Sequence, residues 1–156
     1  MGKAIEELNV GDVALSPGRT VTETDVVMFS GLSGDTNPAH TDAVHSSKSP
    51  FGERIAHGAL VLSMATGLSA RIGDLDGTAL AALGIDEWRF HAPVKFGDTI
   101  YLRSTVLEAR PTSKPDRGVL RRKMEILNQD GTVVQSGIHS TMVMTLAAKA
   151  ARQSEK

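Results

Sequence analysis

Cysteine is absent from this sequence of 156 residues, and aromatic side chains make up only 4% of it. A chain without cysteine can form neither a disulfide framework nor a zinc site built on thiolates. This absence is compatible with a reducing compartment, and we expect the protein in the cytoplasm. Acidic residues such as Glu6 and Glu7 lie near the N-terminus, where a signal peptide needs an apolar run, and they favour the same location.

The sequence also lacks an excess of charge of either sign and a long uninterrupted apolar run. Its formal net charge is -1 at pH 7, and charged residues make up 22% of the chain. These values are typical of a globular domain with no attraction to nucleic acid or to a membrane surface. The most apolar stretch, residues 55–72, is too interrupted to provide the about 20 apolar residues that span a membrane. We therefore expect neither nucleic acid nor membrane among the partners.

The hydrophobic pattern predicts helices in the first half of the chain. A capping box formed by Thr22 and Asp25 predicts a first helix that ends near residues 31–34. The predicted apolar face of this helix consists of Val26, Val27, Phe29 and Leu32. A first strand is expected from residues 13–15 and 20–21, and a short helix is expected over residues 42–45.

The second half of the chain has the pattern of a sheet that follows one long helix. Residues 55–72 are apolar on all sides, which predicts a buried helix. Strands are predicted near residues 79–91, 99–110, 118–128 and 132–146, and Asp130-Gly131 predicts a hairpin turn between the last two. This order of elements is typical of an α+β domain. We expect one domain over residues 1–146 and a tail over residues 147–156 that is either a frayed helix or disordered.

The segment from Gly34 to His40 is the best candidate for chemistry, because it contains a carboxylate and an imidazole. On a helix of about 100° per residue, Asp35 and His40 would point about 140° apart. On a strand they would point to opposite faces. Only an irregular loop lets them converge on one water, and Gly34 and Pro38 suit such a loop. The alternative is an Asx-type turn in which Asp35 and Asn37 cap backbone groups and His40 is solvated.

Three segments of the sequence resemble the MaoC-like dehydratases, the family of the (R)-specific enoyl-CoA hydratases. They are residues 29–40 (FSGLSGDTNPAH) with Ser46 beyond them, residues 51–58 (FGERIAHG) and residues 90–99 (FHAPVKFGDT). The resemblance covers most of residues 10–145. It implies a hot-dog fold, in which a long antiparallel sheet wraps around one buried central helix.

The resemblance also implies a reaction, the reversible hydration of a trans-2-enoyl-CoA to an (R)-3-hydroxyacyl-CoA. Asp35 and His40 would be the catalytic pair that activates water. The amide of Gly58, at the start of the buried helix, would stabilise the thioester oxygen, because a helix N-terminus favours negative charge. Asn37 would orient the loop.

Other candidate residues have supporting roles. Ser63 and Thr66, one or two turns along the helix, would support the carboxylate. The densest basic stretch, which includes Lys114, Arg117 and Arg121, predicts either a solvated hairpin or a clamp for the phosphates of coenzyme A. Coenzyme A would be part of the substrate, and no cofactor is expected because the sequence has no dinucleotide or phosphate-loop motif.

A metal site is a weaker interpretation of the same region. The possible ligands are His40, Asp42, His45 and His57. His40 and His45 are five residues apart, so a helix would not align them on one face. We therefore expect no metal.

Two other functions are compatible with the fold. A hot-dog acyl-CoA thioesterase would cleave the thioester, and a non-catalytic acyl-CoA-binding module would use the loop only to shape a pocket. The order Asp-x-Asn-Pro-x-His argues against the first, and the intact pair of Asp35 and His40 argues against the second. A hot-dog monomer would leave a sheet edge and one end of the acyl pocket unprotected, so we expect a homodimer with sites at or near the interface.

Overall fold

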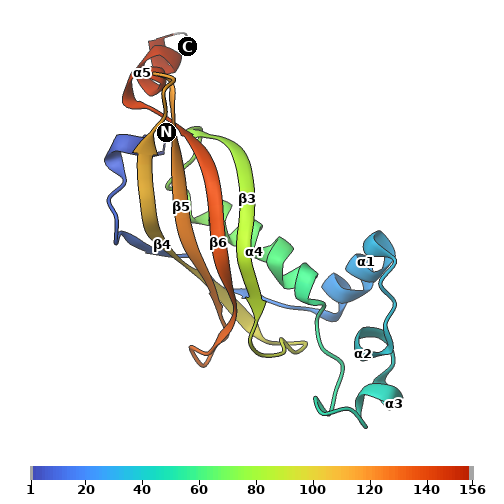
Figure 1. The fold of residues 1–156 in the computed structure, drawn as a ribbon. Helices are drawn as coiled ribbons and strands as arrows, with labels where there is room; N and C mark the ends of the chain where they lie inside the picture. Colours follow the sequence, from blue (N-terminus) through green and yellow to red (C-terminus); the bar gives the residue numbers. More distant parts are fainter. Residues whose placement is uncertain (1, 155–156) are drawn as a thin grey trace.

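The computed structural model describes residues 2–154 as a six-stranded antiparallel sheet with one long helix against its face (Figure 1). The strands follow the order β1-β4-β5-β6-β3, and β2 also pairs with β4. Their bounds are Val13–Leu15 (β1), Arg19–Thr20 (β2), Ala79–Phe90 (β3), Thr99–Pro111 (β4), Arg117–Leu127 (β5) and Val133–Met144 (β6). This arrangement confirms the predicted α+β hot-dog fold.

The turn between β5 and β6 lies where Asp130-Gly131 predicts it. Gly131 has a φ of 78°, a left-handed conformation that glycine adopts without a steric penalty. The backbone N–H of Asn128 donates to the carbonyl of Thr132 over 3.0 Å. The side-chain oxygen of Asn128 accepts from the amides of Asp130 and Thr132 at 3.1 and 2.9 Å. Local hydrogen bonds therefore close this turn.

The central helix α4 (Gly58–Ile72) packs one side against the sheet. Its buried side chains meet those of β4, β5 and β6 in the main core, whose members include Leu60, Val61, Met64, Ala65, Leu68, Ile100, Leu102, Met124, Ile126 and Val134. The helix begins later than residue 55, because Ile55 forms a bridge with Lys95 and His57 is an extended N-cap.

The prediction that this helix is buried on all sides is wrong for a single chain. The side that faces away from the sheet is exposed and carries Ala59, Ser63, Thr66, Gly67 and Ala70. One sheet covers only one side of a helix, and these small or hydroxylated side chains leave the other side open.

A helical arm extends beyond the N-terminal end of α4 (Figure 1). It contains α1 (Glu23–Ser33), α2 (Pro38–Thr41) and α3 (Ala43–Ser46). The capping box at the start of α1 is confirmed: the amide of Thr22 donates to the Asp25 carboxylate over 2.8 Å, and the amide of Asp25 donates to the Thr22 hydroxyl over 3.3 Å. The helix ends at Gly34, whose φ of 76° reverses the chain direction.

The predicted apolar face of α1 is only partly correct. Val26 is buried at 1% exposure, whereas Val27 and Leu32 are 62% and 84% exposed. Helix α1 packs mainly against α4, so only a narrow side of it is covered. The short helix predicted over residues 42–45 is present as α3, and α2 precedes it.

The C-terminal segment forms a helix, α5 (Leu146–Ser154), which contacts the N-terminal turn η1 (Ile5–Glu7). The ammonium of Lys149 lies 2.7 Å from the Glu7 carboxylate, and the amide of Leu146 donates to Glu6 over 2.9 Å. The helical alternative for the tail is therefore correct up to Ser154, and residues 155–156 lie outside the described residues. The domain boundary at residue 146 stays a prediction. Within residues 2–154, no helix is long and apolar enough to cross a membrane.

Candidate active site

One cavity, of about 490 Å³, lies at the N-terminal end of α4, between the helical arm and the ends of β3 and β6. All three segments that carry the family resemblance contribute to it or border it. Its lining consists of His40, Phe51, Ile55, Ala56, Gly58, Ala59, Val61, Phe90, His91, Ala92, Pro93, Val94 and Gln135. The cavity is predominantly apolar, with a few polar groups, which is the usual character of a small-molecule site.

Asp35 lies in the loop between α1 and α2, immediately after Gly34. Its backbone N–H donates to the hydroxyl of Ser33 over 3.1 Å, and its carboxylate accepts from the amide of Asn37 over 3.2 Å. The side-chain oxygen of Asn37 in turn accepts from the amide of Ala39 over 2.9 Å and caps α2. The predicted Asx-type contacts are therefore present, but they do not exclude chemistry, since the carboxylate remains exposed and can accept further hydrogen bonds.

His40 lies on the one-turn helix α2, which corrects the prediction of a wholly irregular loop. It is half-buried and lines the cavity, so it is not the solvated residue of the alternative interpretation. Its Nδ1 lies 2.7 Å from the carbonyl oxygen of Ile55, and the amide of Ile55 donates to Ala39 over 3.1 Å. Because a carbonyl only accepts, Nδ1 carries the hydrogen and Nε2 of the neutral ring has a lone pair.

Ser46, which follows the first resembling segment, connects α3 to α2 within the helical arm. It is fully buried, and its hydroxyl donates to the carbonyl of Pro38 over 3.0 Å. Asp42 is the N-cap of helix α3, and its carboxylate accepts from the amide of His45 over 2.9 Å. This hydrogen bond lowers the pKa of Asp42. Asp42 and His45 therefore stabilise the helix end, and neither belongs to the cluster around His40.

The side chains of Asp35 and His40 converge with a third group, His57. One side-chain oxygen or ring nitrogen from each of the three residues lies within 4.8 Å of the others. His57 is 2% exposed, and its ring centroid lies 3.8 Å from that of His40 with an interplanar angle of 32°. Sequence reasoning grouped His57 with His40 only as a possible metal ligand and gave it no role beside Asp35.

The same three residues are a possible ligand set for a metal ion, and the ring geometry argues against that use. An ion bound by two histidines lies in the plane of both rings, about 2 Å from each nitrogen. The rings of His40 and His57 lie against each other with a tilt of 32°, and one nitrogen of each ring, His40 Nδ1 and His57 Nε2, is bonded to a backbone carbonyl and cannot bind a metal as well. The arrangement is better suited to proton transfer, and the absence of a metal stays a prediction.

The first turn of α4 lines the cavity through Gly58 and Ala59. No side chain among residues 2–154 caps this turn, because the N-cap residue is His57 and its ring points elsewhere. The carbonyl of Gly58 accepts a hydrogen bond from the side-chain amide of Gln135 over 3.1 Å. The indole N–H of Trp88 donates to the side-chain oxygen of Gln135 over 3.0 Å. Sequence reasoning missed Gln135, because β6 carries several polar side chains and only the structure shows that this one is buried.

Two predicted supporting residues do not reach the carboxylate. The hydroxyl of Ser63 donates to the carbonyl of Ala59 over 3.0 Å, and that of Thr66 donates to the carbonyl of Ser63 over 2.7 Å. Both side chains lie on the exposed side of α4. The structure corrects this assignment, because each hydroxyl is bonded to its own helix.

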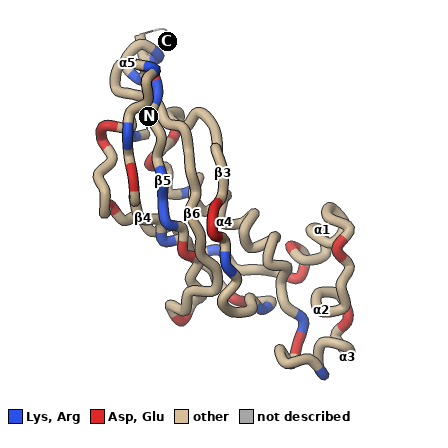
Figure 2. The backbone as a smooth tube through the Cα atoms, in the orientation of Figure 1, with Lys and Arg blue, Asp and Glu red and all other residues tan. Residues whose placement is uncertain are grey.

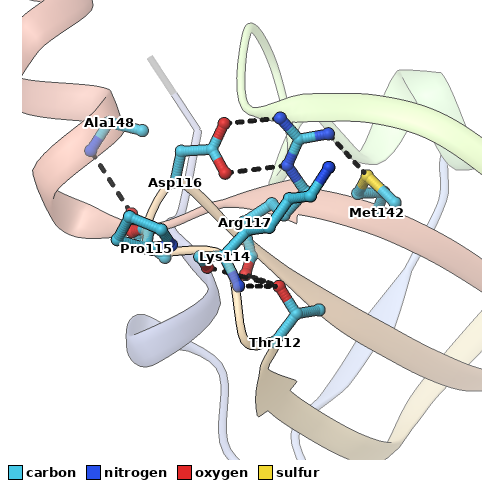
Figure 3. Close-up of polar contacts among 8 residues, drawn as sticks. Thr112, Lys114, Pro115, Asp116, Arg117, Met142 and Ala148 are labelled. Atoms are coloured by element: carbon cyan, nitrogen blue, oxygen red, sulfur yellow. Dashed lines mark hydrogen bonds and ion pairs between the residues drawn. The ribbon is translucent and has the colours of Figure 1, made fainter.

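The predicted phosphate clamp is also not assembled at the cavity of a single chain. Lys114 and Arg117 lie at the turn between β4 and β5, beside α5 and at the other end of the sheet from the arm (Figures 1 and 3). Arg117 forms two hydrogen bonds with Asp116, at 2.8 and 2.5 Å, which lower the pKa of Asp116 and raise that of Arg117.

Arg121 lies further along β5, in the stretch Arg121-Arg122-Lys123, and Figure 2 shows a continuous blue segment on that strand. Its guanidinium is 3.7 Å from Glu108 and 4.0 Å from Asp86. Arg117 and Arg121 therefore pair with acidic residues, and Lys114 lies far from the cavity. This arrangement agrees with the alternative prediction of a solvated hairpin.

Sequence comparison identifies relatives of this chain. Residues 8–125 match the family described as the MaoC like domain. Protein MaoC of Klebsiella aerogenes is 45% identical over 103 residues, which are 66% of this chain and 30% of that protein. An (R)-specific enoyl-CoA hydratase of Rhodospirillum rubrum is 37% identical over 110 residues, which are 70% of this chain and 73% of the hydratase. The chain thus spans less than two thirds of the first relative.

Solved structures show the same fold. An Archaeoglobus protein described as a monoamine oxidase regulatory protein aligns with a TM-score of 0.84 and 34% identity, over 92% of this chain and 95% of that one. A Mycobacterium tuberculosis protein described as having a double hot-dog fold aligns with a TM-score of 0.77 over 92% of this chain and 44% of that one. At 21% identity, this second likeness concerns the fold alone.

Proposed function

This chain belongs to the MaoC like domain family, and on that premise we propose that it is a hydro-lyase. The proposed reaction is the reversible addition of water to a trans-2-enoyl-CoA, which yields an (R)-3-hydroxyacyl-CoA. The observation that carries the proposal is the convergence of the Asp35 carboxylate and a ring nitrogen of His40 beside a cavity that the start of α4 also lines. The hydratase of Rhodospirillum rubrum supports the choice of reaction.

The pair would activate one water molecule. Nε2 of His40 has a lone pair because Nδ1–H is bonded to Ile55, so Nε2 accepts a proton as the water oxygen attacks C3. The second hydrogen stays on the water oxygen and donates a hydrogen bond to the Asp35 carboxylate, which orients the water. A proton then returns from the pair to C2, so the product differs from the substrate by one water. Delivery of oxygen and proton from one side corresponds to syn addition.

The start of α4 would stabilise the charge that develops on the thioester oxygen. As C3 is attacked, electrons move towards that oxygen and form an enolate. The Gly58 N–H lies at the positive end of the α4 dipole, and no side chain among residues 2–154 caps that turn. A donor held in place before the reaction is worth a few kcal/mol of barrier in other enzymes. Gln135 helps to hold it, because it bonds the carbonyl of Gly58.

A panel of acyl-CoA substrates tests this function. We expect trans-2-enoyl-CoA of at least one chain length to lose its enoyl absorbance, and (R)-3-hydroxyacyl-CoA to gain it, while the (S)-enantiomer is inert. Release of free coenzyme A without loss of the double bond would instead indicate the thioesterase. Tight binding without turnover of any substrate would favour the binding module, an alternative that the regulatory-protein description of the Archaeoglobus structure keeps open.

We predict that catalysis needs no metal. Dialysis against a chelator should leave the hydration rate unchanged, because the proposed proton transfers use only Asp35 and His40. Elemental analysis of the purified protein should find less than one equivalent of any transition metal per chain. A stoichiometric metal whose removal abolishes activity, and whose return restores it, would contradict this prediction.

We propose that the protein is a homodimer that buries the edge strand β3 and the open side of α4. Within residues 2–154, β3 pairs with β6 alone, and its side chains Leu80, Leu83 and Ile85 are exposed. An apolar edge strand left unpaired invites pairing with another copy. Light scattering should therefore give the mass of two chains.

A matched pair of variants tests this interface. Leu83→Arg introduces a charge on β3 and should shift the mass towards one chain. Leu107→Arg, on β4, changes a side chain of similar exposure on a strand away from this edge and should leave the dimer intact. A fully active monomer would contradict the proposed assembly.

A further inference from the structure

His57 is a buried histidine that contacts each part of the proposed site, and no step of the proposed reaction uses it. Its Nε2 lies 2.9 Å from the backbone carbonyl oxygen of Asp35 and 3.4 Å from the hydroxyl of Ser30. A carbonyl only accepts hydrogen bonds, so Nε2 carries the hydrogen and donates it to Asp35. This bond joins the start of α4 to the loop that carries the catalytic carboxylate.

Two ring contacts extend the connection to the rest of the site. The His57 ring stacks on that of His40 at a centroid distance of 3.8 Å. The ring of Phe29, on α1, lies 5.0 Å from that of His57 and tilted by 54°. The backbone of His57 is also the N-cap of α4, directly before Gly58. One residue therefore touches the carboxylate loop, the imidazole and the start of the helix.

The other nitrogen of this ring shows that packing alone does not explain a histidine here. Nδ1 of His57 is buried and has no hydrogen-bond partner among residues 2–154. An unpaired buried polar atom destabilises a fold, and native proteins contain few of them. An apolar side chain of similar size would avoid this penalty. We therefore infer that the hydrogen bond from Nε2–H to the Asp35 carbonyl is the reason for a histidine at this position.

We propose that His57 is a positioning residue, whose Nε2–H holds the Asp35 carbonyl and thereby fixes the carboxylate relative to His40. This inference rests on the proposed function. The Asp35 side chain is otherwise restrained by the 3.2 Å bond from the Asn37 amide, and its loop is exposed. Without this hydrogen bond, the Asp35 carboxylate is free to shift relative to His40. A misplacement of about 1 Å costs about 100-fold in rate at other active sites.

Two substitutions separate the hydrogen bond from the shape of the ring. In His57→Gln, the side-chain amide nitrogen can occupy the position of Nε2 and keep the donor to Asp35. In His57→Leu, the volume is largely kept and the donor is lost. We expect His57→Leu to lower kcat by about 30-fold to 100-fold with KM changed less than threefold. His57→Gln should retain kcat within about fivefold of the wild-type enzyme.

A second readout does not depend on turnover. Hydrogen exchange of the backbone amides of residues 35–37, 39 and 40 reports how firmly the loop is held; Pro38 has no amide hydrogen. Exchange should accelerate in His57→Leu and stay close to wild type in His57→Gln. Ser30→Ala is the matched control, because it removes the weaker 3.4 Å contact and should change neither exchange nor kcat. If wild-type protein hydrates no enoyl-CoA, the proposed function fails and the exchange measurement still tests the contact.

The pattern across the variants decides the inference. A folded His57→Leu protein with wild-type kcat and loop exchange would overturn it. Equal losses in the Leu and Gln variants would also overturn it, since ring stacking or packing would then explain the effect. If His57→Leu does not fold, His57→Asn replaces it, because that amide is too short to reach the Asp35 carbonyl. His57→Asn should then show the loss, and Gln should show the rescue.

Discussion

Asp35→Asn is expected to lower the turnover of trans-2-enoyl-CoA by about 100-fold or more, the usual scale of general acid–base catalysis. Asparagine keeps the shape of the side chain and can still accept the hydrogen bond from the Asn37 amide at 3.2 Å. It lacks the negative charge that holds the water and stabilises the His40 imidazolium formed when that water loses its proton. The loop should therefore keep its conformation, and the thermal midpoint should stay close to that of the wild-type protein while kcat falls.

His40→Ala should lower kcat on a similar scale, because it removes the Nε2 lone pair that faces the cavity. The two groups would act on one water, so the double variant should lose much less than the product of the two single losses. Asp42→Asn is the matched control. Asp42 is a neighbouring carboxylate that caps α3 through the His45 amide, and asparagine caps helices equally well.

Rates near wild type in both single variants would contradict the assignment of the pair. The turn-capping interpretation of Asp35 and Asn37 would then account for the loop. The measurement requires the best substrate found in the panel, because a poor substrate can hide a loss of chemistry behind slow binding or product release.

Gly58→Pro is expected to lower kcat by about 100-fold or more relative to Gly58→Ala, the scale reported for the loss of one oxyanion donor. Proline lacks the backbone N–H that we assign to the thioester oxygen. It is well tolerated at the first position of a helix, where that N–H has no partner within the helix. The preceding residue, His57, has φ and ψ values of -60° and 137°, which are compatible with a following proline.

Gly58→Ala is the control for steric effects. A Cβ at this position would lie 2.7 Å from the ring of Phe90, and both substitutions introduce that Cβ. Phe90 is 64% exposed, so its ring has room to move. The difference between the two variants therefore reports the amide hydrogen. Equal activities of Gly58→Pro and Gly58→Ala would show that this amide does not stabilise the transition state.

The elements that the sequence predicts correctly depend on interactions between residues close together in the chain. The capping box of Thr22 and Asp25, the end of α1 at Gly34 and the turn at residues 130–131 each depend on groups within a few residues of one another. The strands follow from apolar alternation along β4, β5 and β6, since side chains of successive residues point to opposite faces. The motifs of residues 29–40, 51–58 and 90–99 are sufficient to identify the family.

Burial was harder to predict, because it depends on what packs against a segment. Residues 55–72 have the composition of a buried helix, but a single sheet covers only one side of α4. Val27 and Leu32 are apolar and exposed for the same reason, since α1 lies beyond the sheet. The basic residues near Arg117 resembled a phosphate clamp in sequence, and the tertiary structure places them at the end of the sheet far from the cavity.

The sequence by itself determined the fold class, the local turns and caps, and the residue types available for acid–base chemistry. Only the tertiary structure decided which of these residues meet. His57 bonds Asp35 across 22 residues of sequence, and Gln135 bonds Gly58 across 77. Such contacts depend on where the N-terminal end of α4 lies relative to the arm and to β6. That placement results from burying the apolar side of α4 against the whole sheet, which no local pattern encodes.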